Sequence, residues 1–264
     1  MGFRAALVCV ALFTSAAWGD DAPKIRDFDI PTVENLGQAI YQQDQEAWKA
    51  TDVLNAQYSL DQLKAEKLHG WVVDTAPGRD VVRFVRDGAS GPEVLCDVTF
   101  TPDIAQSCVV PPSLALAPPE LAQYAARTLA LKNIERPCSN RYNTVVLKDP
   151  ERDGWLVWAL AATEEPGVIV YGGHYRFTVS ADGNTIIERD ALSRACLNIG
   201  PPDPSKGAFV ASMFVQLVSN VPVETTVWLN LLHKHPFYLI TPDRAEWSIE
   251  NGHISRMGTL PDKK

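Results

Sequence analysis

Hydrophobic residues change from a helical to a strand pattern within the first half of the chain. Between residues 31 and 54 the apolar positions recur every three or four residues, which predicts a long amphipathic helix with a capping hydroxyl at Thr32. A shorter helix is predicted over residues 60–68, ending before Gly70. Short β-branched runs then follow, separated by turn pairs, at residues 71–74, 81–86, 93–100 and 107–110. These runs predict an antiparallel β-meander.

Four prolines between residues 111 and 119 end this meander, because proline cannot donate to a sheet ladder. A helix is predicted from Pro118 to about Asn133. Its apolar face carries Leu121, Tyr124, Ala125, Thr128 and Leu129. The later apolar runs match strands separated by turn residues and a proline-rich link, with Asp182-Gly183 and Asn251-Gly252 as hairpin turns. These runs lie at residues 142–148, 155–162, 168–171, 174–180, 185–190, 209–218, 225–232, 237–241, 247–249 and 253–257.

These patterns predict an α+β fold. N-terminal helices with an antiparallel β-meander come first, followed by a helix packed on a larger antiparallel sheet of about five to eight strands. We predict one unit over residues 20–112 and a second over residues 113–264, because each stretch has apolar strands enough for its own core. One continuous sheet, with the proline-rich connector crossing its edge, is the alternative.

The first 19 residues match a cleavable signal peptide. A short positive region ends at Arg4, an apolar stretch covers residues 5–13, and Ala17 and Gly19 place small residues where signal peptidase inspects them. The apolar stretch is too short to span a bilayer, which takes about 20 residues. We therefore predict cleavage after Gly19, a periplasmic or secreted protein, and no transmembrane segment in the mature chain. An uncleaved N-terminal anchor is the alternative.

Four cysteines remain after signal cleavage, and an even number in an exported chain predicts two disulfides. Cys96 and Cys108 lie nearly symmetrically about the turn at Pro102, so a hairpin would place them opposite each other. Cys138 would then pair with Cys196. Zinc bound by these four residues is the competing interpretation, but the chain has no Cys-x-x-Cys pair.

Composition excludes several classes of protein. Hydrophobic residues make up 46% of the chain, enough to bury a core, which excludes a disordered polymer. The 24 Lys and Arg residues are outnumbered by 32 Asp and Glu residues, giving a net charge of -8. Without a clustered basic run to neutralise phosphates, nucleic acid is excluded as a partner.

Histidines and carboxylates offer the candidate chemistry. His233 and His235 would point the same way on a strand and offer two imidazoles to a metal, but no nearby acid or cysteine completes the ligand set. Asp44 and Asp52 share a helix row with Trp48, a pattern that fits either a catalytic carboxylate pair or the margin of an amphipathic helix. We predict no metal site and no cofactor.

Ser193 would need a histidine such as His174 brought close to act as a nucleophile, and it lacks the Gly-x-Ser-x-Gly context of a nucleophile elbow. We therefore expect no catalytic residues. The sequence favours an exported, disulfide-stabilised binding or envelope-associated protein without catalytic activity, whose ligand is a protein or a small molecule. A secreted hydrolase with its site near Asp44, His174 or Ser193 is the alternative.

Overall fold

The computed structural model describes residues 25–76, 79–201 and 210–261, so the predicted signal peptide lies outside the described residues. The first half contains two helices and a three-stranded meander: α1 (Ile30–Gln57), α2 (Leu60–Ala65), β1 (Leu68–Ala76), β2 (Arg79–Gly88) and β3 (Gly91–Thr99). The α1 helix begins at Ile30, where the Asp29 side chain, rather than that of Thr32, is the cap and accepts the Thr32 backbone N–H at 2.9 Å.

The meander is antiparallel, as predicted, with the order β1-β2-β3. The fourth predicted run, residues 107–110, forms only an isolated antiparallel bridge between Asp97 and Val109. Pro111 and Pro112 follow that bridge directly, and their missing N–H donors prevent a longer ladder.

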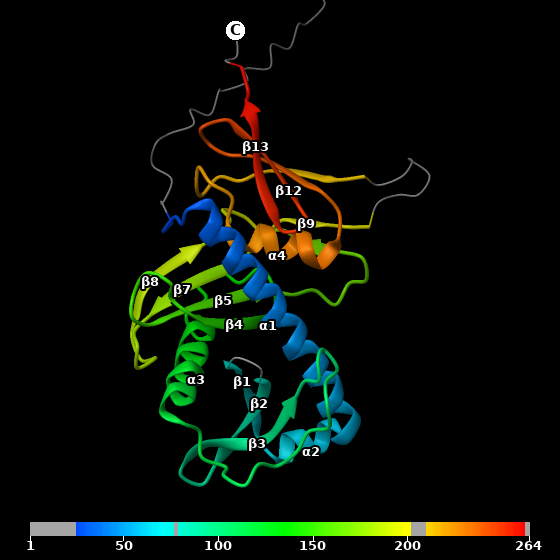
Figure 1. The fold of residues 1–264 in the computed structure, drawn as a ribbon, viewed down its shortest axis with the longest axis vertical. Coiled ribbons are helices and arrows are strands. Elements are labelled where there is room, and N and C mark those ends of the chain that lie inside the picture. Colours follow the sequence, from blue (N-terminus) through cyan, green and yellow to red (C-terminus); the bar gives the residue numbers. More distant parts are fainter. Residues whose placement is uncertain (1–24, 77–78, 202–209, 262–264) are drawn as a thin grey trace, which may run out of the picture.

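The second half begins with α3 (Pro118–Leu131), which packs on a four-stranded antiparallel sheet of order β4-β5-β7-β8, called the central sheet below (Figure 1). A separate short ribbon pairs β6 with β9, and a second four-stranded sheet has the order β10-β11-β12-β13. The strand bounds are β4 (Tyr142–Lys148), β5 (Trp155–Ala161), β6 (Ile169–Val170), β7 (Tyr175–Val179), β8 (Ile186–Ala191), β9 (Asn198–Ile199), β10 (Ser212–Val215), β11 (Phe237–Ile240), β12 (Ala245–Glu250) and β13 (His253–Thr259).

The α+β class is confirmed, with three corrections to the predicted second half. Its described strands form two larger sheets rather than one, and the C-terminal sheet contains a parallel pair, β10 with β11. The predicted strand over residues 225–232 is a helix, α4 (Glu224–His233). Residues 224–230 of this helix are all buried, and in a run buried on every side the hydrophobic pattern does not distinguish a helix from a strand.

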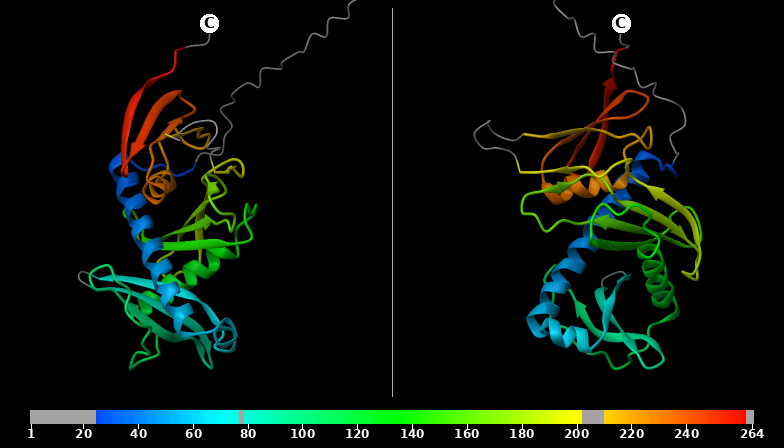
Figure 2. Two further views of the ribbon diagram at one scale, coloured as in Figure 1. Left: turned by 90° about the vertical axis from the view of Figure 1, so that its right-hand side faces the viewer. Right: turned by 180° about the vertical axis from the view of Figure 1, so that it is seen from behind.

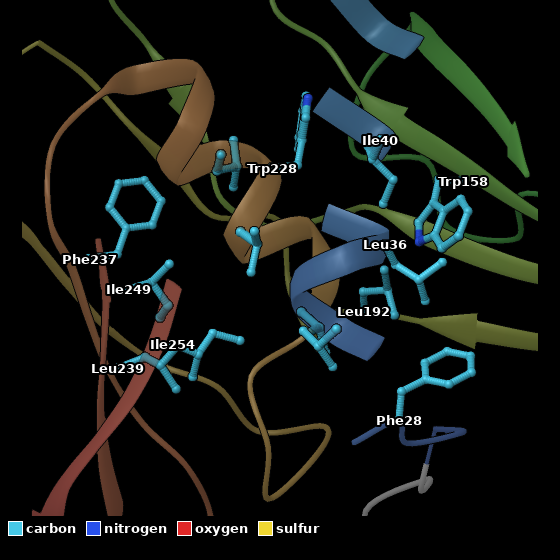
Figure 3. Packing of buried hydrophobic residues seen from close by; sticks show 14 of the residues in the cluster. Phe28, Leu36, Ile40, Trp158, Leu192, Trp228, Phe237, Leu239, Ile249 and Ile254 are labelled. Atoms are coloured by element: carbon cyan, nitrogen blue, oxygen red, sulfur yellow. The ribbon is translucent and has the colours of Figure 1, made fainter. Parts of the chain in front are cut away.

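The α1 helix runs from beside α4 to the meander and contributes to two cores (Figures 1 and 2). Val33, Leu36 and Ile40 pack in the core shared with α4, the central sheet and the C-terminal sheet, where Figure 3 shows Leu36 and Ile40 between Trp228 and Trp158. Ala50 and Leu54 pack in the core of the meander. The predicted boundary between units at residues 112–113 stays a prediction. The α1 helix contributes residues to the core of the meander and to the core of the second half.

Two disulfides link cysteines within the described residues, with the pairing expected from the sequence. Cys96 joins Cys108 within the buried meander core, and their Cα atoms are 5.5 Å apart. Cys138 joins Cys196 across 58 residues, which ties the segment after α3 to the segment after β8. None of the helices in the described parts of the chain is long and apolar enough to cross a membrane.

Candidate functional site

The α3 helix buries two polar side chains and two alanines, and it leaves part of its apolar face at the surface. Its buried residues are Gln123, Ala126, Arg127 and Ala130, whereas Leu121 is 40% exposed. The two alanines let the helix approach the central sheet closely. Of the predicted apolar face, Leu129 and Tyr124 are partly buried against neighbouring cores, whereas Leu121 is exposed.

The two buried polar side chains of α3 are satisfied by neighbouring strands. The Gln123 amide donates to the backbone oxygens of Val73 in β1 and Val146 in β4, at 3.1 and 3.2 Å. The Arg127 Nε donates to Thr144 Oγ1 at 2.8 Å, and its guanidinium lies 4.7 Å from the ring centre of Trp71. Because these groups have partners, the helix can bury them between the meander and the central sheet.

A groove of about 900 Å³ follows the exposed apolar face of α3 and is open to solvent. We call it the α3 groove. Three parts of the chain contribute to its wall besides α3 itself: the start of β3, the facing ends of β4 and β5, and the turn between β7 and β8. Its lining residues are Pro92, Pro118, Pro119, Leu121, Ala122, Tyr124, Ala125, Thr128, Leu129, Lys132, Lys148, Trp155, Ala181, Asp182, Gly183 and Asn184.

The wall opposite α3 is held rigidly. Trp155 is 6% exposed, and its Nε1 donates to the Ala181 carbonyl at 3.1 Å, which fixes the β7–β8 turn to β5. Gly183 in this turn has a φ of +77° and lies so close to the Ala122 carbonyl that a Cβ would clash with it. The turn therefore abuts α3 and delimits the groove on that side.

The charge lining the α3 groove is positive, in contrast to the net charge of -8 on the whole chain. Lys132 and Lys148 are exposed, and the Lys148 ammonium lies 3.7 Å from the ring centre of Trp155. The Asp182 carboxylate accepts from Ser180 Oγ and from the Asn184 backbone N–H, and these hydrogen bonds lower its pKa. The Asp182 carboxylate therefore forms its hydrogen bonds within its own turn, whereas Lys132 and Lys148 line the groove.

His174 and Ser193, predicted as candidate residues, line one cavity of about 490 Å³ beside the Cys138–Cys196 disulfide. The His174 Nδ1 accepts the Ala161 N–H at 3.0 Å, so its Nε2 carries the proton and donates to the Val170 carbonyl at 3.0 Å. Burial lowers the pKa of His174 to about 4. A histidine whose two nitrogens bond the backbone offers no free base to a nucleophile.

Ser193 has a local structural role. Its Oγ accepts the Gly173 N–H at 2.7 Å and donates to the Ala195 carbonyl at 2.9 Å. The bond to Ala195 lies within the turn that leads to Cys196, and the bond from Gly173 ties that turn to the segment before β7. The hydroxyl is aligned with two backbone groups rather than with an imidazole.

Asp44 and His174 both contact Trp228. The Asp44 Oδ2 accepts the Trp228 indole N–H at 3.2 Å, and burial raises the pKa of Asp44 to about 6. The Trp228 ring meets the His174 ring edge-on, with centroids 5.4 Å apart. The other members of the predicted row point outward, since Asp52 is exposed and Trp48 is 60% exposed.

The histidine pair is not on a strand. His233 is the last residue of α4 and His235 lies in the turn that follows, with ring centroids 6.2 Å apart. The His235 Nε2 shares a hydrogen bond of 2.9 Å with Ser212 Oγ. Within the described ranges, no group of three or more His, Cys, Asp or Glu side chains is placed to hold a metal ion.

The α3 groove was missed by the sequence analysis, although its helix was predicted. The one available indication was the combination of an apolar helix face with neighbouring prolines at positions 118 and 119. No protein-family model matches the chain, and comparisons with curated proteins and with solved structures gave no match either. The geometry of the site therefore carries the functional argument alone.

Proposed function

We propose that this chain is an exported, disulfide-stabilised binding protein of the periplasm or the extracellular space, and that it binds an acidic, apolar segment of a partner protein in the α3 groove. The observation that carries the proposal is a solvent-open groove along the partly exposed apolar face of α3, walled by Trp155 and lined by two lysines. An apolar groove with a few placed polar groups is the common form of a ligand site.

The shape of the groove favours a peptide segment over a small molecule. A small ligand is usually enclosed over most of its surface, whereas the α3 groove is open to solvent. The 14 residues of α3 span about 21 Å, enough to contact several turns of a helix. Helix-in-groove recognition uses this geometry, with apolar anchors spaced three and four residues apart.

The charge of the groove selects an acidic segment. Lys132 and Lys148 would pair with carboxylates at the edges of the apolar contact, while the acidic remainder of the chain would repel a basic segment weakly. The absence of catalysis in this proposal is supported by the backbone hydrogen bonds that occupy both nitrogens of His174 and the hydroxyl of Ser193.

Export is supported by the two disulfides, since such bonds persist in oxidising compartments. We expect the mature protein to begin at Asp20 when the full sequence is expressed with a bacterial secretion pathway. N-terminal sequencing of the secreted or periplasmic product checks this. A purified product that retains Met1 would contradict cleavage.

The groove is tested with a pair of synthetic peptides of opposite charge. Each peptide has about 14 residues, with leucines at helical spacing; one carries glutamates on its polar face and the other carries lysines. We expect the glutamate peptide to bind and to shift the backbone amide resonances of α3 and of Lys148. Leu121→Asp or Lys148→Glu should weaken this binding about tenfold or more, because each removes an anchor of the contact.

Two matched variants control for general effects of the substitutions. Leu60→Asp changes a leucine that is 71% exposed on α2, and Lys64→Glu reverses a lysine on the same helix. Both should leave affinity for the glutamate peptide within about twofold, because neither residue lines the α3 groove. The charge-reversed protein, with Lys132→Glu and Lys148→Glu, should instead prefer the lysine peptide. Equal loss in the test and control variants would rule out the groove as the binding site.

A further inference from the structure

A third cavity, of about 220 Å³, lies between α1 and the meander. We call it the Glu46 cavity. Its lining comes from one face of α1, from the start of β2 and from the turn after β3. The lining residues are Tyr41, Gln42, Gln45, Glu46, Lys49, Asp80, Phe100, Pro102 and Asp103.

Glu46 is the unusual residue of this cavity. It is 7% exposed, and its Oε1 accepts from Gln42 Nε2 at 3.0 Å. Its Oε2 is fully buried and has no hydrogen-bond partner among the described residues. A buried carboxylate oxygen without a donor costs more free energy than most native structures tolerate, so its position calls for a missing donor.

The surroundings of Glu46 favour a cation as that donor. Asp80 and Asp103 act on Glu46 through their negative charge, and Lys49 offsets only part of it. Burial, together with these two carboxylates, raises the pKa of Glu46. The Lys49 ammonium donates to the Asp103 carbonyl at 3.2 Å and so does not supply the bond that Oε2 lacks.

Two aromatic rings, Tyr41 and Phe100, complete the cavity wall. Carboxylates next to aromatic faces are the combination that binds organic cations, because the ring quadrupole attracts a positive charge without hydrating it. The volume of about 220 Å³ exceeds that of a single water several times over and falls below the usual range for drug-sized ligands. A short alkyl chain ending in a charged group would fit.

We propose that the Glu46 cavity binds the primary ammonium group of a small organic cation, with the Glu46 carboxylate accepting its N–H. The same chemistry is offered by a free alkyl amine and by the lysine side chain of a peptide. The proposal is independent of the α3 groove, since the two cavities share no lining residue.

The test is calorimetric titration of the mature protein with four probes: n-pentylamine, n-pentanol, pentyltrimethylammonium and N-acetyl-lysine methylamide. We expect saturable binding of n-pentylamine and none of n-pentanol, because the alcohol lacks the charge. The quaternary ammonium should bind about tenfold more weakly than the amine, because it has no N–H to give to Glu46. Binding of the lysine probe as tight as that of the amine would identify a peptide side chain as the source of the group.

Variants of α1 locate the site. Glu46→Gln should weaken n-pentylamine binding about tenfold or more, and Asp52→Asn, which changes an exposed carboxylate on the same helix, should leave it within about twofold. Lys49→Met removes the competing cation and should tighten binding several-fold, so the proposal also predicts a gain. Unchanged affinity in Glu46→Gln, no saturable binding of any amine, or binding of Ca²⁺ that excludes the amine would each overturn it.

Discussion

Arg176→Met is expected to lower the free energy of unfolding by about 3–5 kcal/mol, because it leaves two buried carboxylates without their cation. Arg176 is 1% exposed in the central sheet. Its Nε and Nη2 donate to Asp190 Oδ2 at 3.1 and 2.7 Å, and its Nη1 donates to both oxygens of Glu224 at 2.9 and 3.1 Å. Urea unfolding followed by circular dichroism measures the loss.

The effect should be large because the cluster of Arg176 with Asp190 and Glu224, called the Arg176 cluster, joins three parts of the chain. Glu224 begins α4 and also accepts the Trp158 indole N–H at 2.7 Å, while the Arg176 Nη2 donates to the Arg26 carbonyl. The guanidiniums of Arg26 and Arg176 lie 4.6 and 4.8 Å from the ring centre of Phe28. Removing Arg176 therefore loosens the N-terminal segment and α4 from the central sheet together.

Two further variants separate the cost of an unpaired charge from the loss of a side chain. Arg141→Met removes a surface pair with Glu164, whose side chains are 67% and 75% exposed, and should change stability by no more than about 1 kcal/mol. Adding Asp190→Asn and Glu224→Gln to Arg176→Met should recover part of the lost stability, because no charge then remains unpaired. If Arg176→Met costs no more than Arg141→Met, the cluster does not stabilise the fold.

Local patterns in the sequence were sufficient for the elements whose burial is one-sided. The long helix α1, the three strands of the meander and the turn between Cys96 and Cys108 all follow from periodicities within about ten residues. The α4 helix was predicted as a strand. It is buried on nearly all sides, so its sequence has no polar face that would indicate a helical period. Its β-branched residues, such as Thr225 and Val227, then favoured a strand.

The buried Arg176 cluster and the α3 groove both depend on contacts between residues far apart in the chain. Arg176 meets Glu224 across 48 positions and Arg26 across 150, and neither separation leaves a local pattern. The inward turn of α3 depends on carbonyls of Val73 and Val146 that accept from Gln123. Because the sequence does not show which strands flank a helix, its amphipathic pattern predicts that an apolar face exists but not whether that face is covered.

The pH dependence of stability should reveal two buried groups with opposite effects. The pKa of Asp44 is raised to about 6, so its folded form holds a proton that the unfolded form has released. The contribution of Asp44 to the free energy of unfolding is therefore complete below about pH 4 and is lost as the pH rises through about 6. The pKa of His174 is lowered to about 4, so its contribution is complete above pH 6.5 and is lost as the pH falls toward 4.

In the wild type the two contributions change the free energy of unfolding with pH in opposite directions, so they largely cancel between pH 4 and 6. Substituting one of the two groups should leave the pH dependence of the other visible. Asp44→Asn keeps an oxygen that accepts the Trp228 indole N–H but cannot ionise. Relative to the wild type, it should gain about 2–3 kcal/mol between pH 4 and 7, since one pKa unit corresponds to about 1.4 kcal/mol. Its own stability should rise steeply with pH, which is the effect of His174.

His174→Gln should change the pH dependence of stability in the opposite direction. Loss of packing and of a backbone hydrogen bond lowers its stability at every pH, but the deficit relative to the wild type should be largest near pH 7 and shrink by about 2–3 kcal/mol toward pH 4. Urea titrations at five pH values give both curves, with Asp52→Asn, an exposed carboxylate on α1, as the variant that should follow the wild type. Parallel curves for all four proteins would show that neither buried group is linked to folding, whereas slopes of opposite sign for Asp44→Asn and His174→Gln would assign one linked proton to each of these two groups.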